Sequence, residues 1–259
     1  MRKIIKRSSQ PPLHFDRSEL LKIINGNYRT KVRKIEIPYN NECVNLTFSA
    51  SLWRNVSTDR DLESVIRFRN FHAIIEQNDK YIGYICLKQV EKTEPCSLYY
   101  LWDEADSESG ALEAIIYMLS VSWTERRLNR LLEVPVLELS EAWTAPSAPH
   151  GIAFTALRYL VRAARIRHGL AILRLAPHEY LRPDPFPTDP DERKALEKAR
   201  THRTNAMRRH YARHLKFETL KNAPGYMWAH YSSKGEWTTQ IKLKPDNPKR
   251  DLRKEQRTE

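Results

Sequence analysis

A strand, a glycine-containing turn and a helix follow one another between residues 131 and 167, and this succession constrains the fold more than any other stretch. An extended run over 131–143 leads into a turn rich in Pro and Ala, and an apolar helix begins just after Gly151. The first amides of a helix lack internal acceptors and lie at the positive end of its dipole. Because Gly151 has no side chain and Ala153 has one methyl group, a phosphate can approach these amides. The alternative is that Gly151 only permits a tight turn.

The rest of the pattern predicts hairpins with helices between them. Residues 72–90 form the clearest hairpin, since two β-prone runs flank the polar turn 77–80. Pro135, inside the extended run, predicts a bulge or an edge position. Helices are predicted over 17–25, 58–71, 107–123 and from Asp189 or Asp191 to His214, and further strands over 33–37, 43–50, 96–103, 170–177, 216–220, 225–232 and 237–243. The predicted fold class is α/β (α+β), with a mixed, mostly antiparallel sheet flanked by helices.

The order of elements predicts how the chain is organised. Residues 1–69 form an N-terminal helix and strand part with a basic N-terminus, and residues 70–244 form the core. Two insertions interrupt this core, a helical one at 107–130 and a Pro-rich, basic one at 178–204. Residues 245–259 are charged and interrupted by Pro, which predicts a disordered basic tail.

The chain is strongly basic, with 44 Lys and Arg against 32 Asp and Glu and a formal charge of +12. This excess favours a polyanionic partner, such as nucleic acid or a phosphorylated cofactor, or else a solvated basic surface. Much of it lies in the segment 193–216, which carries nine Lys or Arg residues. Phosphates of a tRNA or DNA partner are expected to pair with four of them, Arg200, Arg203, Arg208 and Arg209.

Other features argue against several classes of protein. No apolar run reaches the roughly 20 residues needed to cross a bilayer, and the first residues lack the apolar core of a signal peptide. Three cysteines without CxxC spacing argue against a disulfide framework or zinc site and favour a reducing cytoplasm. The acidic run 103–109 lacks the glycine and final glutamate of a calcium loop. Five histidines are too irregularly spaced for a metal site, and we expect them on the surface: His150, His178, His202, His210 and His214.

From about residue 70 to 231, the order of elements resembles the GNAT superfamily of acetyl-CoA-dependent N-acyltransferases. The family signature is Arg or Gln, two residues, Gly, one residue, then Gly or Ala. The segment "APHGIA" has this frame and matches both small positions, with Ala148 in place of Arg or Gln. "KYIGYICL", which contains Gly83, resembles the third strand of the family, "LAILRLAP" the fifth and "GYMWAHY" the last. "NAMRRHYARHLKF" resembles a family helix at Asn205 and Phe217, with Lys216 replacing the usual glycine.

The resemblance implies that acetyl-CoA, or another acyl-CoA, is the cofactor. Its thioester carbonyl is expected to meet a backbone amide on the splayed fourth strand, near Trp143, Thr144 and Ala145. Its pyrophosphate is expected on the turn and helix start, at Pro149, His150, Gly151, Ile152, Ala153 and Phe154, with Asn205 from the later helix.

The same resemblance implies a carboxylate on the fourth strand that takes the proton of the acceptor amine, directly or through water. Glu138 and Glu141 are the candidates, and their odd separation predicts that they point to opposite faces. We favour Glu138, which shares a face with Ser140 and Ala142, although either glutamate also fits a solvated position on an edge strand. Tyr211 is expected either to protonate the thiolate or to be a core aromatic.

Two functions therefore stay open. The first is an N-acyltransferase that moves an acetyl or related group to an amine acceptor, including one on a nucleic acid. The second is a nucleic-acid-binding protein on the same scaffold, with a degenerate cofactor site. Both functions use the basic segment 193–216, so it does not distinguish between them.

Overall fold

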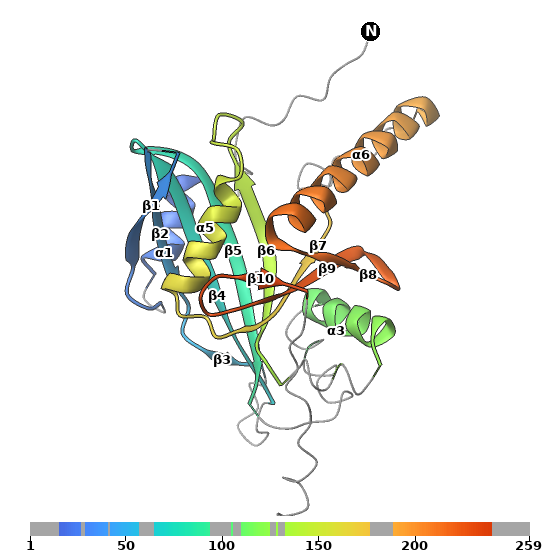
Figure 1. The fold of residues 1–259 in the computed structure, drawn as a ribbon, viewed down its shortest axis with the longest axis horizontal. Helices are drawn as coiled ribbons and strands as arrows, with labels where there is room; N and C mark the ends of the chain where they lie inside the picture. Colours follow the sequence, from blue (N-terminus) through green and yellow to red (C-terminus); the bar gives the residue numbers. More distant parts are fainter. Residues whose placement is uncertain are drawn as a thin grey trace, which may run out of the picture.

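The computed structural model describes residues 16–26, 29–40, 42–56, 65–93, 105, 110–124, 128, 133–176 and 189–239 (Figure 1). Several expectations lie wholly or partly outside these residues: the basic N-terminus before residue 16, the first part of the helix over 58–71, the strand over 96–103, the first residues of the helix over 107–123, His178 with the start of the insertion 178–204, the end of the strand over 237–243, and the tail 245–259.

The described strands form one ten-stranded sheet, in the order β1-β2-β4-β5-β6-β7-β9-β10, with β3 paired to β4 and β8 paired to β9. All pairs are antiparallel except β6 and β7, which are parallel. The expected fold class, with a mixed and mostly antiparallel sheet flanked by helices, is confirmed. The strands are β1 Arg33–Tyr39, β2 Glu42–Ala50, β3 Arg54–Asn55, β4 Ile66–Gln77, β5 Lys80–Lys92, β6 Val136–Thr144, β7 Gly169–Arg174, β8 Glu218–Leu220, β9 Ala223–Tyr231 and β10 Trp237–Thr238.

The hairpin predicted over 72–90 is formed by β4 and β5. Its turn residues Asn78 and Asp79 have positive φ angles of 49° and 58°. A two-residue hairpin turn with positive φ at both positions matches the twist of the strands, and Asn and Asp tolerate this conformation better than other residues with side chains. The turn chemistry in the sequence therefore fixed the position of the hairpin correctly.

The helix predicted over 58–71 is wrong for its second half, because β4 already begins at Ile66. Ile66 and Phe68 are buried on one face of the sheet, whereas Arg67 and Arg69 lie on the other, with both guanidinium groups over the ring of Trp53. This alternation has a period of two and is typical of a strand. Apolar residues three and four positions apart also occur in this segment, and they led to the prediction of a helix in place of a strand.

Helices cover both faces of the sheet. On one face α5 (Ile152–Ala163) buries Ile152, Leu157 and Leu160 in a large core with β1, β2, β4 to β7 and β9. On the other face α1 (Arg17–Ile24) covers Ile74 and Tyr84, and α3 (Gly110–Ser122) packs beside β8 and β9. Figure 1 shows α5 and α1 on either side of the sheet. All three helices were predicted, and α1 starts at the N-cap Asp16.

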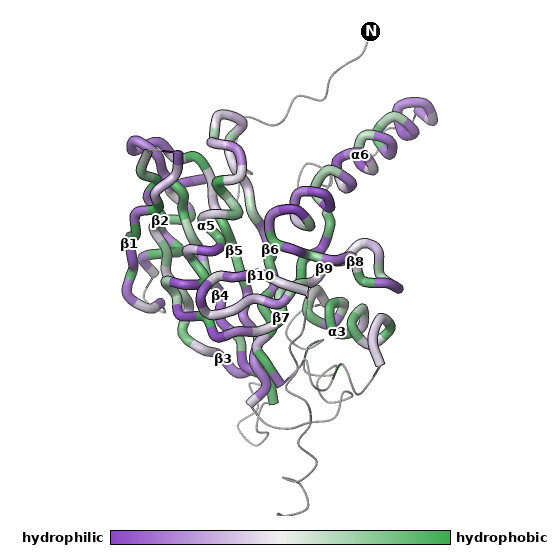
Figure 2. The backbone as a smooth tube through the Cα atoms, viewed as in Figure 1, coloured by the Kyte–Doolittle hydropathy of each residue, from purple (hydrophilic) through white to green (hydrophobic). Residues whose placement is uncertain are grey.

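Helix α6 (Pro190–Leu215) starts at Asp189, one of its two predicted caps, and extends away from the sheet (Figure 1). Leu215 is its one buried residue, and Met207 and Tyr211 pack against the core on the side of α5. The first half is mostly exposed and hydrophilic (Figure 2). The helix ends at Lys216, whose φ of 55° and ψ of 30° are left-handed. This is the conformation for which glycine is usual at a helix end.

Candidate functional site

The parallel strands β6 and β7 pair over a short distance only. Val136, Leu137 and Glu138 lie opposite Leu170, Ala171 and Ile172, and no further pair joins the two strands. Beyond Glu138, β6 continues along β5 as far as Thr144, while β7 continues along β9. The last six residues of β6 therefore have a paired neighbour on one side only. The turn that leads to α5 follows directly.

The bulge in β6 lies at Ser140 and not at Pro135. Cys86 is opposite Glu141 and Leu87 is opposite Leu139, so Ser140 is an extra residue in β6. Pro135 instead precedes the first residue of the strand, where its carbonyl accepts a hydrogen bond from the amide of Leu170 at 2.9 Å. A proline at this position removes no ladder donor, so it needs neither a bulge nor an edge.

The bulge overturns the prediction that Glu138 and Glu141 point to opposite faces. Glu138 is opposite Lys88 and Glu141 is opposite Cys86, and directly opposed residues of an antiparallel pair share a face. Lys88 and Cys86 are two residues apart and also share a face. The extra residue thus brings both glutamates to the face that α1 and α3 cover, whereas Ala142 packs in the core on the side of α5.

Glu141 lies in a group of aromatic side chains from β5 and β6, where β6 pairs with β5 alone. The hydroxyl of Tyr84 donates a hydrogen bond to Glu141 Oε1 at 2.7 Å. The Trp143 ring centroid is 6.2 Å from that of Tyr84 and 5.8 Å from that of Tyr81. Burial, followed by the bond to Glu141, raises the pKa of Tyr84 far above its ordinary value, so the hydroxyl stays protonated and acts as a donor. One oxygen of Glu141 is therefore held, and the orientation of its carboxylate is set.

Glu138 has different surroundings, because it lies where β6 still pairs on both sides. Lys88 is opposite it on β5 and Ile172 is opposite it on β7. Opposite charges in directly opposed positions stabilise a sheet by about 0.2–1 kcal/mol. A role in pairing with Lys88 is thus open to Glu138, whereas Glu141 lies opposite Cys86 and accepts the hydrogen bond of the Tyr84 hydroxyl.

The backbone amides of β6 alternate in direction beyond the bulge. The amide of Ala145 donates to the carbonyl of Ile82 at 2.8 Å, and ladder alternation then directs the amide of Trp143 toward β5 as well. The amides of Ala142 and Thr144 point the other way, to the side on which β7 no longer pairs with β6. Among the three residues predicted to meet a thioester carbonyl, Thr144 is the one whose N–H faces this side.

The turn before α5 is shaped by backbone hydrogen bonds and by Gly151. The amide of Ala148 donates to Ala145, and those of Phe154 and Thr155 donate to Gly151. Gly151 has a φ of 87° and a ψ of 0°, and it caps α5 with no side-chain bond. This positive φ is by itself a sufficient reason for a glycine, which agrees with the alternative that Gly151 permits a tight turn. Within the described chain, the amides of Gly151 and Ala153 have no backbone acceptor.

Ala148, the position at which the family signature has Arg or Gln, is partly buried and packs against the core. Tyr39 holds the turn, since its hydroxyl donates to the carbonyl of His150. The peptide between His150 and Gly151 is trans, so this carbonyl points opposite to the N–H of Gly151. Pro149 accepts from the amide of Ile152 at 3.2 Å, and Ile152 itself is buried.

Asn205 and Tyr211 of α6 have structural surroundings. Asn205 Oδ1 accepts a 2.7 Å bond from Arg208, and Arg208 also donates to the carbonyl of Pro224 at 3.1 Å. Arg208 thus joins α6 to β9 and is held within the protein. Tyr211 packs edge-on against Phe154 and Phe217, with centroids 5.2 and 5.7 Å away, and burial raises its pKa to about 12. These contacts are those of the core aromatic that the sequence left open as an alternative.

Sequence reasoning missed a cluster of histidines beside the turn. The ring of His150 lies 5.6 Å from that of His210 and 6.1 Å from that of His214, and the two α6 rings are 6.0 Å apart. Phe154 stacks on His214 at 4.8 Å. His210 and His214 are four residues apart on one helix, which was a visible signal, but only the fold brings His150 to them.

A second missed group is a row of polar residues under α1. His72 of β4 lies opposite Cys86 of β5, and Cys86 lies opposite Glu141. Burial lowers the pKa of His72 to about 4, with a smaller effect of Arg29, and burial raises the pKa of the Cys86 thiol. The thiol is therefore protonated and not a nucleophile at neutral pH. Nδ1 of His72 and Nη1 of Arg29 are buried and have no hydrogen-bond partner among the described residues.

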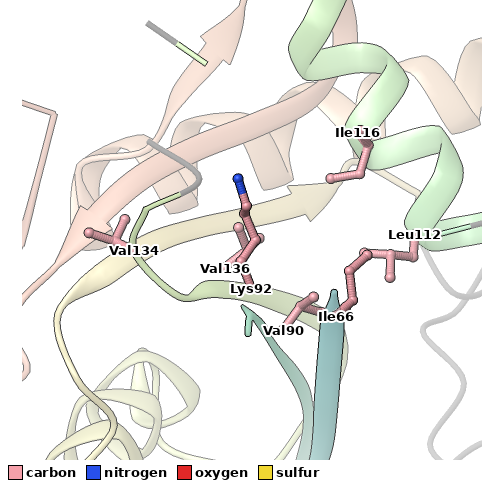
Figure 3. A pocket seen from close by; sticks show the side chains of 7 residues that line it. All are labelled: Ile66, Val90, Lys92, Leu112, Ile116, Val134 and Val136. Carbon is pink, nitrogen blue, oxygen red and sulfur yellow. The ribbon is translucent and has the colours of Figure 1, made fainter. Parts of the chain in front are cut away.

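Figure 3 shows an apolar cavity between α3 and the adjoining ends of β4, β5 and β6. Its volume is about 10 Å³, room for about one water molecule, whereas sites for small molecules measure about 300–1,000 Å³. It is therefore a packing defect and not a cofactor site. It is lined by Ile66, Val90, Lys92, Leu112, Ile116, Val134 and Val136.

No group of three or more His, Cys, Asp or Glu side chains in the described ranges is arranged to hold a metal ion. None of the described helices is both long enough and apolar enough to span a membrane. Searches with this chain against protein-family models, curated proteins and solved structures found no match.

Proposed function

We propose that this protein is an N-acyltransferase that moves an acetyl or related acyl group from acyl-CoA to an amine. One observation carries the proposal. The strand β6 leaves its parallel neighbour β7 after three pairs and continues along β5 alone. It leads directly into the turn before α5, in which the amides of Gly151 and Ala153 have no backbone acceptor within the described chain. Ligands of sheets with parallel strands bind at the carboxyl ends of such strands, where neighbours diverge.

The residues of the turn suit a pyrophosphate. The amides of Gly151 and Ala153 have no backbone acceptor within the described chain, Gly151 adds no side chain, and the carbonyl of His150 is held away by Tyr39. These groups would hold the pyrophosphate of acyl-CoA, together with the dipole of α5. When bound, acyl-CoA supplies an acyl group already activated as a thioester. The amide of Thr144, which faces the side left by β7, is the donor for its carbonyl.

Glu141 is the better candidate for the general base, in place of Glu138. It lies beyond the bulge, on the part of β6 that has lost its neighbour, and Tyr84 orients its carboxylate. Glu138 lies between two paired strands and opposite Lys88. In this proposal the second oxygen of Glu141 accepts the proton of the acceptor amine, directly or through one water, so that the amine attacks as a neutral nucleophile.

The proposal is tested by the release of CoA thiol from acetyl-CoA in the presence of amine acceptors. Candidate acceptors are spermidine, a lysine-containing peptide and tRNA. We expect Glu141→Gln to lower the rate by about 100-fold or more, with little change in acetyl-CoA affinity. Glu138→Gln is the matched control and should change the rate much less. A large loss in Glu138→Gln with none in Glu141→Gln would return the role to Glu138.

A second candidate function, binding of nucleic acid, rests on the shape and charge of α6. The first half of the helix extends from the body (Figure 1), and Arg193, Lys194, Lys198 and Arg200 on it are exposed. A helix that only closed the core would not need this extension. Its side chains can track a phosphate backbone, and they also suit an acceptor amine carried on tRNA.

Salt dependence tests this candidate. Affinity for tRNA should fall steeply between ~50 and ~200 mM salt, because each contact to a phosphate releases a counterion. Replacing Lys198, Arg200 and Arg209 by Gln should flatten that dependence, whereas Arg208 is left intact because it joins α6 to β9. The control with equal loss of charge replaces Lys31, Lys34 and Lys80, which are exposed elsewhere. Equal effects of the two triple variants would remove α6 as the binding element.

A further inference from the structure

The histidine cluster consists of His150, His210 and His214, and it lies at the first turn of α5. His150 directly precedes Gly151, the N-cap of the helix, and Phe154 in the first turn stacks on His214 at 4.8 Å. The rings of His150 and His210 belong to exposed residues, and that of His214 is half-buried. The cluster is therefore open to solvent on the same side as the first residues of α5.

The groups around the cluster are basic. Those that act electrostatically on His214 are Arg158 from α5, Arg213 from α6, His150 from the turn and His210 from α6. Arg158 also donates a hydrogen bond to the carbonyl of His214, which satisfies one of the last carbonyls of α6. Phe154 and Tyr211 supply the apolar contacts of the cluster. Imidazoles gathered beside two guanidinium groups form a surface that becomes strongly cationic when the histidines are protonated.

We propose that His150, His210 and His214 are a proton-dependent part of the pyrophosphate site, and that they bind the cofactor phosphates more tightly as pH falls. This rests on the function proposed above, since it assigns the same ligand to the same helix start. The open amides supply a part of the affinity that does not depend on pH, and the cluster supplies a part that does.

The direction of the effect follows from the charges. In the free protein, burial and the neighbouring basic groups lower the pKa of His214, so its imidazole is largely neutral near pH 7. A bound dianion favours the imidazolium form and raises the pKa, so a proton is taken up on binding. The extra affinity is full below the pKa of the free protein and is lost as pH rises through the pKa of the complex. One proton taken up with a shift of one pKa unit tightens binding about tenfold.

The test is the affinity for dephospho-CoA, measured by calorimetry from pH 5.5 to 8.5. This probe keeps the pyrophosphate diester but lacks the phosphate monoester, which itself titrates near pH 6. We expect binding to be about tenfold tighter or more at pH 5.5 than at pH 8.5, with proton uptake seen as a dependence of the heat on the buffer. The triple variant His150→Gln, His210→Gln, His214→Gln should lose the pH dependence of binding and the buffer-dependent proton uptake.

Two controls keep the outcomes separate. His168→Gln with His202→Gln removes two exposed histidines away from the cluster and should leave the pH dependence unchanged. His150→Gln alone, at an exposed residue, gives a partial loss if the triple variant does not fold. Binding that is independent of pH, or a triple variant with the full pH dependence, overturns the inference and leaves the proposed function standing. Absence of binding at every pH overturns both.

Discussion

Substitution of Gly151 by Asp, compared with Asn, tests where an anion binds. The two side chains have the same shape, and both tolerate a positive φ better than other residues, so the 87° angle at Gly151 strains both variants alike. A Cβ atom at this position would be 3.4 Å from the hydroxyl of Tyr39, an ordinary contact. The two variants therefore differ by one negative charge among the first amides of α5.

The size of the effect follows from Coulomb's law. A carboxylate about 4 Å from a phosphate charge costs about 1 kcal/mol in bulk water and about 4 kcal/mol near a protein surface. Acetyl-CoA should thus bind Gly151→Asp about 5-fold to 1000-fold more weakly than Gly151→Asn. Calorimetry at pH 8, with circular dichroism to confirm folding of both variants, measures the ratio. Equal affinities of Asp and Asn would refute the assignment of the pyrophosphate to this turn.

Two further predictions concern stability. Lys216→Gly should raise the free energy of unfolding by about 1 kcal/mol, because Lys216 has a left-handed φ of 55°. As the control, Lys198→Gly within the exposed part of α6 should lower the free energy of unfolding by about 1 kcal/mol. Urea unfolding measures both, and a loss of stability in Lys216→Gly would contradict the reasoning. Burial lowers the pKa of His72 to about 4, below its ordinary value of 6.5, so the folded state should lose up to about 3 kcal/mol as pH falls from 6.5 to 4. His72→Gln should flatten this dependence, and an unchanged slope in that variant would show that other groups cause it.

The turns and helix ends that depend on neighbouring residues could be predicted from the sequence. Asn78 and Asp79 identified the hairpin, Asp189 was one of two predicted starts of α6, and the lone Gly151 identified the turn before α5. Each of these residues supplies a hydrogen bond or a backbone angle that its immediate neighbours require.

Features that depend on partners far away in the chain could not be predicted in this way. The extra residue Ser140 has no local signal, and it exists only in the register between β5 and β6. Missing it placed Glu138 and Glu141 on opposite faces. The histidine cluster likewise needs α6 to return beside α5, which brings His150 to His210 over 60 positions. The misassigned segment 58–71 has a different cause, since its last residues carry both spacings and the pairing of β4 decides between them.

The most direct test of the account is an acetyl-CoA titration followed by amide NMR. The pyrophosphate is assigned to the amides of Gly151 and Ala153, and the thioester carbonyl to the amide of Thr144. We expect saturable one-to-one binding in which these three amides shift most, while the exposed first half of α6 changes little. The account would be contradicted if no amide shifted at millimolar acetyl-CoA, or if the shifts were confined to the exposed first half of α6.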